Sequence, residues 1–345
     1  MTRRARALVL GVNLAIGGIL LAWLVRLAGE AAMGRLSSAS SLVGLLAFLA
    51  VVAVAIAGLT WRWRLLLSGL GAPPPFVRLA GYRSAGQTLA ALLPSARIGG
   101  DPLRAWLATR AQVTAPDAIS SVAVDRVLEI GAAAPFSIVF AAVLIQRGVP
   151  ELRSALLTVL VATAALVFAA VTTARRLREG RGLVTSFVRR TRLDALPAVG
   201  RHMDVLERSE AAAARLVVQR RRLALAFGAG FGTNLLVMLE YGVLFSALGL
   251  PADALTIVAA IFASAAAQQL PVPAGVGVLE GGQVWMLGML GYPPEVGLAA
   301  GFAVRLRELV WALPGLICLA ARWLSDAHVR SRRPAAPAAA TGDRA

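Results

Sequence analysis

Long blocks of residues that carry almost no charge recur along this chain of 345 residues. Each block has about the 20 residues that an α-helix needs to cross roughly 30 Å of hydrocarbon. Charged residues make up 15% of the chain and hydrophobic residues 58%, whereas a soluble domain has about 25% and about 45–50%. The pattern predicts an all-α, polytopic membrane helical bundle.

We expect about six full spans and two re-entrant or broken helical segments, in a membrane domain that covers residues 1–325. The spans are expected at residues 7–27, 41–60, 118–145, 154–173, 223–248 and 296–321. The first is too long for the apolar core of a signal peptide and lacks a convincing cleavage site, so we expect it to be retained. Residues 326–345 are expected to form a disordered tail, because they are rich in alanine and proline.

All the basic residues are arginine, a bias typical of a GC-rich, bacterial genome, and they flank the apolar blocks. The net charge of +17 is therefore better explained by the positive-inside rule and anionic lipids than by nucleic acid. The rule predicts a multi-pass protein of the cell membrane, with both termini and the arginine-rich stretch 174–222 in the cytoplasm.

Two features are expected at the cytoplasmic interface. Apolar residues recur at helical spacing within 174–222, which predicts one or two amphipathic helices lying on the membrane surface. Residues 61–64 alternate tryptophan and arginine at the end of the second span, which predicts an anchor in the head-group region.

The first broken segment is expected at residues 77–93, which are too few and too polar for an ordinary span. Candidate binding residues follow it: Arg97, Gly99, Gly100, Asp101 and Arg104. The glycines would let backbone N–H groups approach a phosphate, which the arginines and a helix starting near Asp101 would bind. The alternative is an interfacial turn with Asp101 as helix N-cap and snorkelling arginines.

The second break joins residues 255–269 to residues 280–290. It combines polar and helix-breaking residues: Gln268, Gln269, Pro271, Pro273, Gly275, Gly277 and Glu280. Proline removes a helical hydrogen bond and glycine relaxes the backbone, so freed carbonyls, amides and a carboxylate gather in an apolar region. A kink that only bends the chain would not need all of them, which favours a binding role.

Several ionisable residues lie inside the expected spans: Asp125, Arg126, Glu129, Glu240, Arg305, Arg307 and Glu308. Charges at membrane depth are functional-site candidates, with pairing as the alternative. Asp125 and Glu129 share a helix face, so they form either a salt bridge that fixes packing or a charged wall for a lipid head group. We expect Arg305 or Arg307 to pair with Glu280 or Glu308.

The two interrupted segments occupy corresponding places in the two halves of the chain. One is expected to enter from inside and the other from outside, which predicts an inverted repeat with a transport site at its interface. No catalytic residues, metal ligands or cofactor site are predicted. Cys318 is the single cysteine, which excludes an internal disulfide. His202 and His328 do not lie in a metal-binding motif.

In these motifs the chain resembles the lysylphosphatidylglycerol synthase transmembrane region family, also described as flippase-like integral membrane proteins. The resemblance covers about residues 5–325, and its most specific motif is the second break, where Ala274 replaces a glycine common in the family. It implies the lipid-translocating half of that system, without the fused soluble aminoacyl-transferase domain. The cargo implied is a phospholipid, glycolipid or hopanoid-class lipid.

Three functions follow as hypotheses. A flippase or lipid-handling protein would move or shelter a polar head group, with the site residues named above lining the path. A membrane enzyme or accessory subunit of lipid, glycolipid or hopanoid biosynthesis would need a metal-dependent acidic site, against which the intervening arginines argue. A structural protein would anchor a complex through residues 174–222. The candidate protein partners are a second copy of this chain and a protein of lipid biosynthesis.

Overall fold

The computed structural model describes residues 41–71, 73–92, 99–146, 153–268, 270, 272 and 275–331, with scattered positions between 19 and 34. Some expectations fall outside the described residues: most of the first span, the tail beyond residue 331, and the site candidates Arg97, Gln269, Pro271 and Pro273. Over the residues it describes, the protein is helical and has no strand, which confirms the all-α prediction.

Four helices in the described ranges are long and apolar enough to cross a membrane. They are α2 (Leu42–Ser68), α5 (Ala115–Gln146), α6 (Arg153–Arg178) and α10 (Arg220–Ala247), and they cover four of the expected spans. The last expected span lies in α13 (Pro294–Ser331), a helix of 38 residues whose apolar run is interrupted by charges. The protein is therefore a multi-pass membrane protein.

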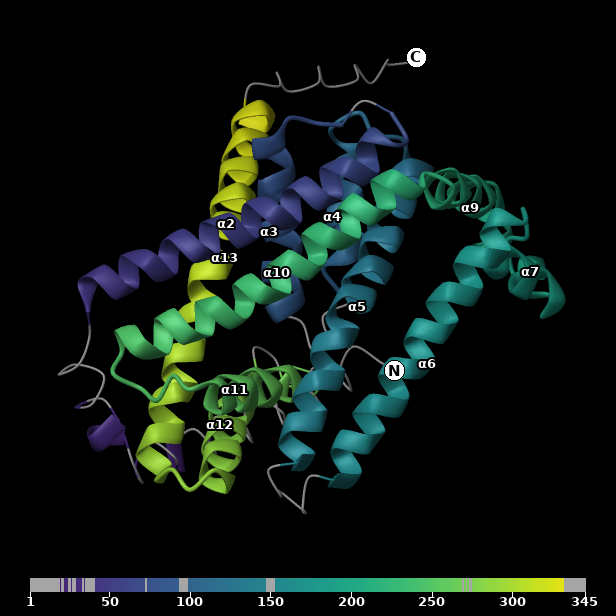
Figure 1. Cartoon of the computed structure of the whole chain (residues 1–345). Coiled ribbons are helices and arrows are strands. Elements are labelled where there is room, and N and C mark those ends of the chain that lie inside the picture. The colour runs from purple at the N-terminus through teal and green to yellow at the C-terminus, as the bar shows by residue number, and fades with distance from the viewer. Residues whose placement is uncertain are drawn as a thin grey trace, which may run out of the picture.

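Both interrupted segments are pairs of short helices. The first is α3 (Phe76–Leu92) with α4 (Asp101–Thr109), and the second is α11 (Ala254–Ala267) with α12 (Val278–Met289). Within each pair the second helix packs against the first, so each pair forms a hairpin. Figure 1 shows α11 and α12 beside the first half of α13, while α3 lies beside its second half.

The arginine-rich stretch contains the short helices α7 (Leu183–Arg190) and α8 (Pro197–Gly200), and the longer α9 (Met203–Val217). One face of α9, which includes Ala212 and Leu216, is buried against the bundle. Its other face is polar, as expected of an amphipathic helix. In Figure 1 these helices lie at the end of the bundle where α6 ends and α10 begins.

The two halves of the fold correspond at a constant offset of 179 residues. The last residue of α2 is 68 and that of α10 is 247, while α5 starts at 115 and α13 at 294. Pro135 inside α5 has its counterpart in Pro314 inside α13. Order, length and helix-breaking proline agree, so residues 42–146 and 220–325 form an internal structural repeat.

The equivalent helices α2 and α10 pack side by side in opposite directions. Close to the start of α2, the Ser41 N–H donates to the Ala247 carbonyl at the end of α10 (2.7 Å). Close to the end of α2, Gln219 donates to the Gly69 carbonyl (3.0 Å) from just before α10. When each residue is replaced by its counterpart at the offset of 179, the first contact becomes the second to within a few residues. A two-fold axis between the two helices requires this relation. The predicted repeat is therefore inverted.

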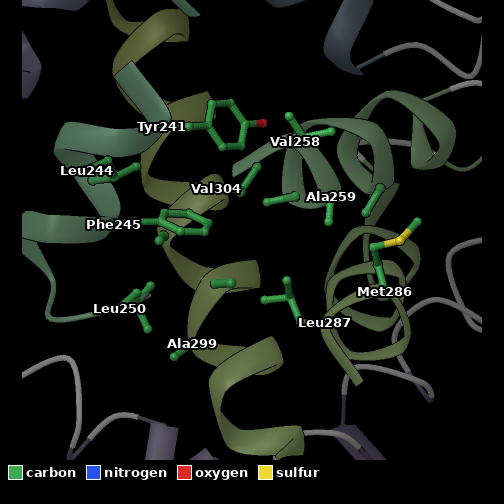
Figure 2. Packing of buried hydrophobic residues seen from close by; sticks show 14 of the residues in the cluster. Tyr241, Leu244, Phe245, Leu250, Val258, Ala259, Met286, Leu287, Ala299 and Val304 are labelled. Carbon is green, nitrogen blue, oxygen red and sulfur yellow. The ribbon is translucent and has the colours of Figure 1, made fainter. Parts of the chain in front are cut away.

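The largest apolar core of the described residues is centred on the second half and also includes Phe48 of α2 and Phe140 of α5. Side chains of α10, α11, α12 and α13 interdigitate there, among them Phe245, Val258, Leu287 and Val304 (Figure 2). Burying these apolar surfaces fixes the second hairpin between its two long helices.

Candidate functional site

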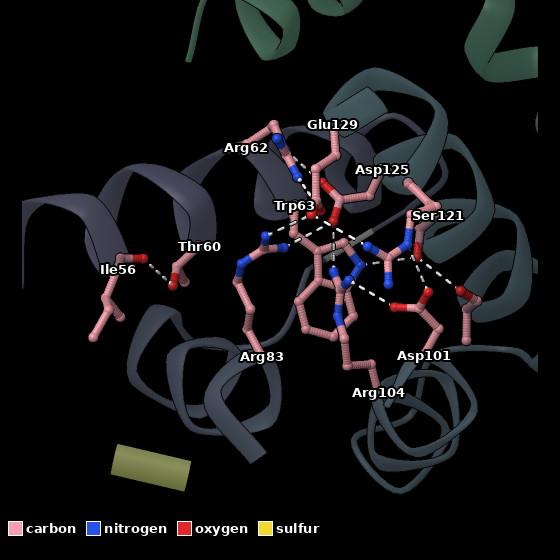
Figure 3. Close-up of polar contacts among 12 residues, drawn as sticks. Ile56, Thr60, Arg62, Trp63, Arg83, Asp101, Arg104, Ser121, Asp125 and Glu129 are labelled. Carbon is pink, nitrogen blue, oxygen red and sulfur yellow. Dashed lines mark hydrogen bonds and ion pairs between the residues drawn. The ribbon is translucent and has the colours of Figure 1, made fainter. Parts of the chain in front are cut away.

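Asp125 is the centre of a buried ionic network that joins four helices. Its Oδ1 accepts from Arg62 Nε at 2.7 Å, and its Oδ2 accepts from Arg83 Nη1 (2.8 Å) and Arg104 Nη2 (2.7 Å). These arginines come from α2, α3 and α4, while Asp125 lies on α5 (Figure 3). The Asp125 side chain has no exposed surface. We call these residues, with Asp101, Arg126 and Glu129, the Asp125 cluster.

The expected interfacial anchor at residues 61–64 is wrong for Arg62 and Trp63. Helix α2 does not end at Thr60 but continues to Ser68, which turns both side chains towards α5. Arg62 is buried on Asp125, and Trp63 is buried with its Nε1 donating to Ser121 Oγ (3.1 Å). The signal in the sequence was Asp125 itself, because a carboxylate inside an apolar span is very costly unless a cation pairs with it.

The accessible edge of the cluster is a triad made of Asp101, Arg126 and Glu129. Arg126 donates to Asp101 (3.0 Å) and to Glu129 (3.2 Å). The three side chains are 18%, 29% and 38% exposed, whereas the arginines on Asp125 are at most 10% exposed. The triad residues are therefore the members of the cluster that a ligand can reach, and Glu129 also joins them to the inner network by accepting from Arg62 (3.3 Å).

The alternative role for Asp101 as N-cap is wrong. Helix α4 begins at Asp101, its N-cap is Gly100, and no side chain caps it. The carboxylate of Asp101 binds Arg104 and Arg126 instead. Gly100 is needed for packing, because a Cβ there would lie 1.9 Å from the Gly86 carbonyl oxygen of α3. Gly99 lies in the turn before it.

A second ionic network, the Glu280 cluster, surrounds the other break. Arg305 Nη2 lies 2.8 Å from Glu280 Oε1, and Arg305 Nη1 lies 2.9 Å from Glu308 Oε2. The same guanidinium donates to the Gly275 carbonyl (3.1 Å), while Glu280 accepts from the Gly277 N–H (2.9 Å). Gly275 and Gly277 have φ of 58° and 76°, which favours glycine at both positions. Arg305 of α13 thus holds Glu280 of α12 by an ion pair and Gly275 before α12 by a hydrogen bond.

Glu240 and Arg307 complete the Glu280 cluster. The two side chains approach to 2.8 Å, and Glu240 also accepts from Trp311 Nε1 (2.7 Å). The Arg307 guanidinium lies over the rings of Tyr241 and Trp311, at 5.1 and 5.4 Å. We expected Arg305 or Arg307 to pair with Glu280 or Glu308, and Arg305 pairs with both acids. Arg307 pairs with Glu240 instead.

The two clusters contain the same triad, related by the repeat. Its members are Asp101, Arg126 and Glu129 in the first half and Glu280, Arg305 and Glu308 in the second, and each residue has its counterpart 179 positions later. In both triads the arginine follows its first acidic partner by 25 residues and precedes the second by three. This spacing was visible in the sequence, but only the ion pairs show that it is one constellation used twice.

The clusters lie at two depths along the packed pair α3 and α13. Thr88 on α3 contacts Ala312 on α13, since its hydroxyl lies 3.1 Å from that carbonyl oxygen. Arg83 of the Asp125 cluster and Glu308 of the Glu280 cluster lie on opposite sides of this level. Counted along the two helices they are roughly nine residues apart, which at 1.5 Å per residue is about 14 Å. The Asp125 cluster has one more arginine than carboxylates, and the Glu280 cluster has one fewer.

No cluster of three histidine, cysteine, aspartate or glutamate side chains in the described part of the chain is placed to hold a metal ion. The fold and its clusters define a class: a multi-pass helical membrane protein built from an inverted repeat, with a charged break in each half. The chain belongs to the lysylphosphatidylglycerol synthase transmembrane region family, whose model matches residues 9–315. This family ties the protein to lipid handling. No curated protein matches the chain.

Proposed function

We propose that the protein translocates a polar lipid head group across the cell membrane. The observation that carries the proposal is the repeated triad, because it places a partly exposed arginine between two carboxylates at each of two breaks. Charged side chains at membrane depth are costly and tend to mark ion and substrate pathways. Broken helices at corresponding positions of two inverted halves are typical of transport sites.

A head group that enters hydrocarbon loses its water, and each unsatisfied polar group costs several kcal/mol. The triads would replace that water. A lipid phosphate would accept from Arg126 or Arg305, and an ammonium group would donate to the carboxylates of the same triad. The charge balance favours phosphate at the Asp125 cluster and a cationic group at the Glu280 cluster.

Movement from one cluster to the other covers about 14 Å, close to half of the ~30 Å hydrocarbon core. In this proposal the termini and helices α7–α9 lie in the cytoplasm, so the Asp125 cluster faces the inner leaflet. The protein adds no chemical group to the lipid. Transport is downhill or is coupled to protons or the membrane potential.

The test in cells compares the total amount and the sidedness of each lipid class, with and without the gene, by lipidomics and outer-leaflet labelling. Arg126→Gln and Arg305→Gln are the informative variants, and Arg208→Gln, on the exposed face of α9, is their matched control. We expect one class to accumulate in the inner leaflet at constant total, with both informative variants copying the deletion. A fall in the total amount of a modified lipid, with sidedness unchanged, would instead support a role in lipid synthesis.

A further inference from the structure

An open groove of about 780 Å³ lies between α2, α3 and α13, away from the ion pairs of both clusters. Its walls are apolar and include Leu49 and Ile56 of α2, Val77 of α3, and Leu313 and Ile317 of α13. Leu49, Val77, Leu313 and Ile317 are exposed, from 44% to 82%. In a membrane-spanning bundle such a surface faces lipid, so the groove is open to an acyl chain from the side.

Two arginines line the same groove at one end. Arg78 lies in the first turn of α3 and Arg110 directly after α4. The start of α3 and the end of α4 lie together because α4 runs back along α3, with Arg104 packed against Gly86. Arg78 and Arg110 are exposed and form no ion pair with any residue that the structure describes, although Arg110 lies 5.1 Å over the Trp106 ring. Two cations at the mouth of an apolar groove complement a phosphate attached to a hydrocarbon chain.

We propose that this groove binds an anionic glycerophospholipid, with one acyl chain against α2 and α13 and its phosphate on Arg78 and Arg110. A volume of about 780 Å³ lies within the 300–1,000 Å³ that small-molecule sites usually have. Arginine suits this role because its planar guanidinium donates two parallel hydrogen bonds to phosphate.

The two arginines of this site occur in the first half of the repeat and have no basic counterparts in the second half. The residues that correspond to Arg78 and Arg110 at the offset of 179 are Ile257 and Met289, so the second half lacks both cations. The lipid is therefore held at the end of the bundle where α3 begins. The inference rests on the proposed lipid transport for its purpose, as a loading site beside the Asp125 cluster, but the binding itself is tested without transport.

Cys318, the single cysteine of the chain, lines the groove and can carry a probe. The experiment places bimane on Cys318 of the full chain in lipid bilayers and measures quenching by brominated phosphatidylglycerol against brominated phosphatidylcholine. The test variant is Arg78→Gln with Arg110→Gln. Its matched control is Arg175→Gln with Arg176→Gln, which removes two exposed arginines from the end of α6.

We expect quenching to show a preference of about fivefold per arginine for the anionic lipid, from roughly 1 kcal/mol per basic residue at the surface. The preference disappears in the test variant and persists in the control. A groove-filling Ala53→Phe lowers quenching by both lipids, whereas Ala164→Phe on the exposed face of α6 does not.

Equal quenching by the two lipids in the protein that keeps Arg78 and Arg110 overturns the inference. A preference for the anionic lipid that survives Arg78→Gln with Arg110→Gln overturns it as well. Absence of quenching by either lipid means that the groove is filled by protein, such as residues 7–27, and overturns it as well. Failure of transport in Arg126→Gln, with the lipid preference intact, leaves this site standing and counts only for the triads.

Discussion

Asp125 accepts hydrogen bonds from three guanidinium groups in a place where its own side chain has no exposed surface. Such a site costs desolvation energy that only complete pairing offsets. Its role is therefore to hold α2, α3, α4 and α5 together, and the salt-bridge alternative describes it better than the charged-wall alternative. The triad residues beside it keep partial exposure and are the ones suited to a ligand.

Asp125→Asn should destabilise the protein by about 3–5 kcal/mol, because it leaves buried arginines without a counter-charge. Thermal or denaturant unfolding in a fixed detergent measures the loss. The control is Asp204→Asn, which removes an exposed partner of Arg208 and should cost less than about 1 kcal/mol. If both variants unfolded alike, the buried network would not be a structural centre.

At the level of helices, close crossings determine how each hairpin packs against the long helices. A Cβ at Gly315 of α13 would lie 2.4 Å from the Ser84 carbonyl oxygen and from Thr88 Oγ1 of α3. Gly315→Leu should therefore push α3 away from α13, at a cost of about 1–3 kcal/mol or more, visible as a lower unfolding temperature. Gly228→Leu is the matched control, because no atom lies within 4 Å of a Cβ there. A stable Gly315→Leu variant would refute this packing.

The caps of α2 and α11 differ in their response to pH. Asp253 caps α11 by accepting from the Leu255 and Thr256 N–H groups (3.0 and 3.1 Å). Burial raises the pKa of Asp253, but hydrogen bonds from Thr256 and Tyr292 outweigh it and hold the pKa below its usual range. The stabilisation is therefore present above the unfolded-state pKa and is lost as pH falls through the lower folded-state pKa.

Asp253→Ala should cost about 1 kcal/mol at neutral pH and progressively less in acid, measured by unfolding across that range. Ser41→Ala removes the cap of α2, a hydroxyl that accepts from Gly44 N–H, and its cost should not vary with pH in this way. An Asp253→Ala cost that stayed constant into acid would show that the carboxylate does not act through its charged form.

At the scale of the whole molecule, apolar block length was sufficient to predict four spans and the all-α class, because a helix must match the bilayer thickness. The breaks were predictable because proline and glycine act locally. Partner choice was harder: Arg305 with Glu280 was expected, but Arg62 and Arg83 were not recognised as partners of Asp125. Those contacts depend on how four helices turn and cross, which periodicity alone does not determine.

The inverted repeat was predicted from two broken segments, yet its register was not. Residue identity between the halves is low, so the offset of 179 became clear only from helix ends and from the paired triads. The packing role of Gly100 was also missed. The chemistry of Gly99 and Gly100 suggested phosphate binding, and the structure adds that Gly100 is buried against Gly86 in a helix crossing.

In the proposed function the two triads act in series on one lipid head group. This order of action can be tested by the translocation of fluorescent lipids with anionic, zwitterionic and cationic head groups in liposomes that contain the purified protein. We predict that Arg126→Gln and Arg305→Gln each slow the transported class more than tenfold, that the double variant is little slower than either, and that Arg208→Gln has no effect. Folded Arg126→Gln and Arg305→Gln proteins that move lipid at the unmodified rate would contradict the account.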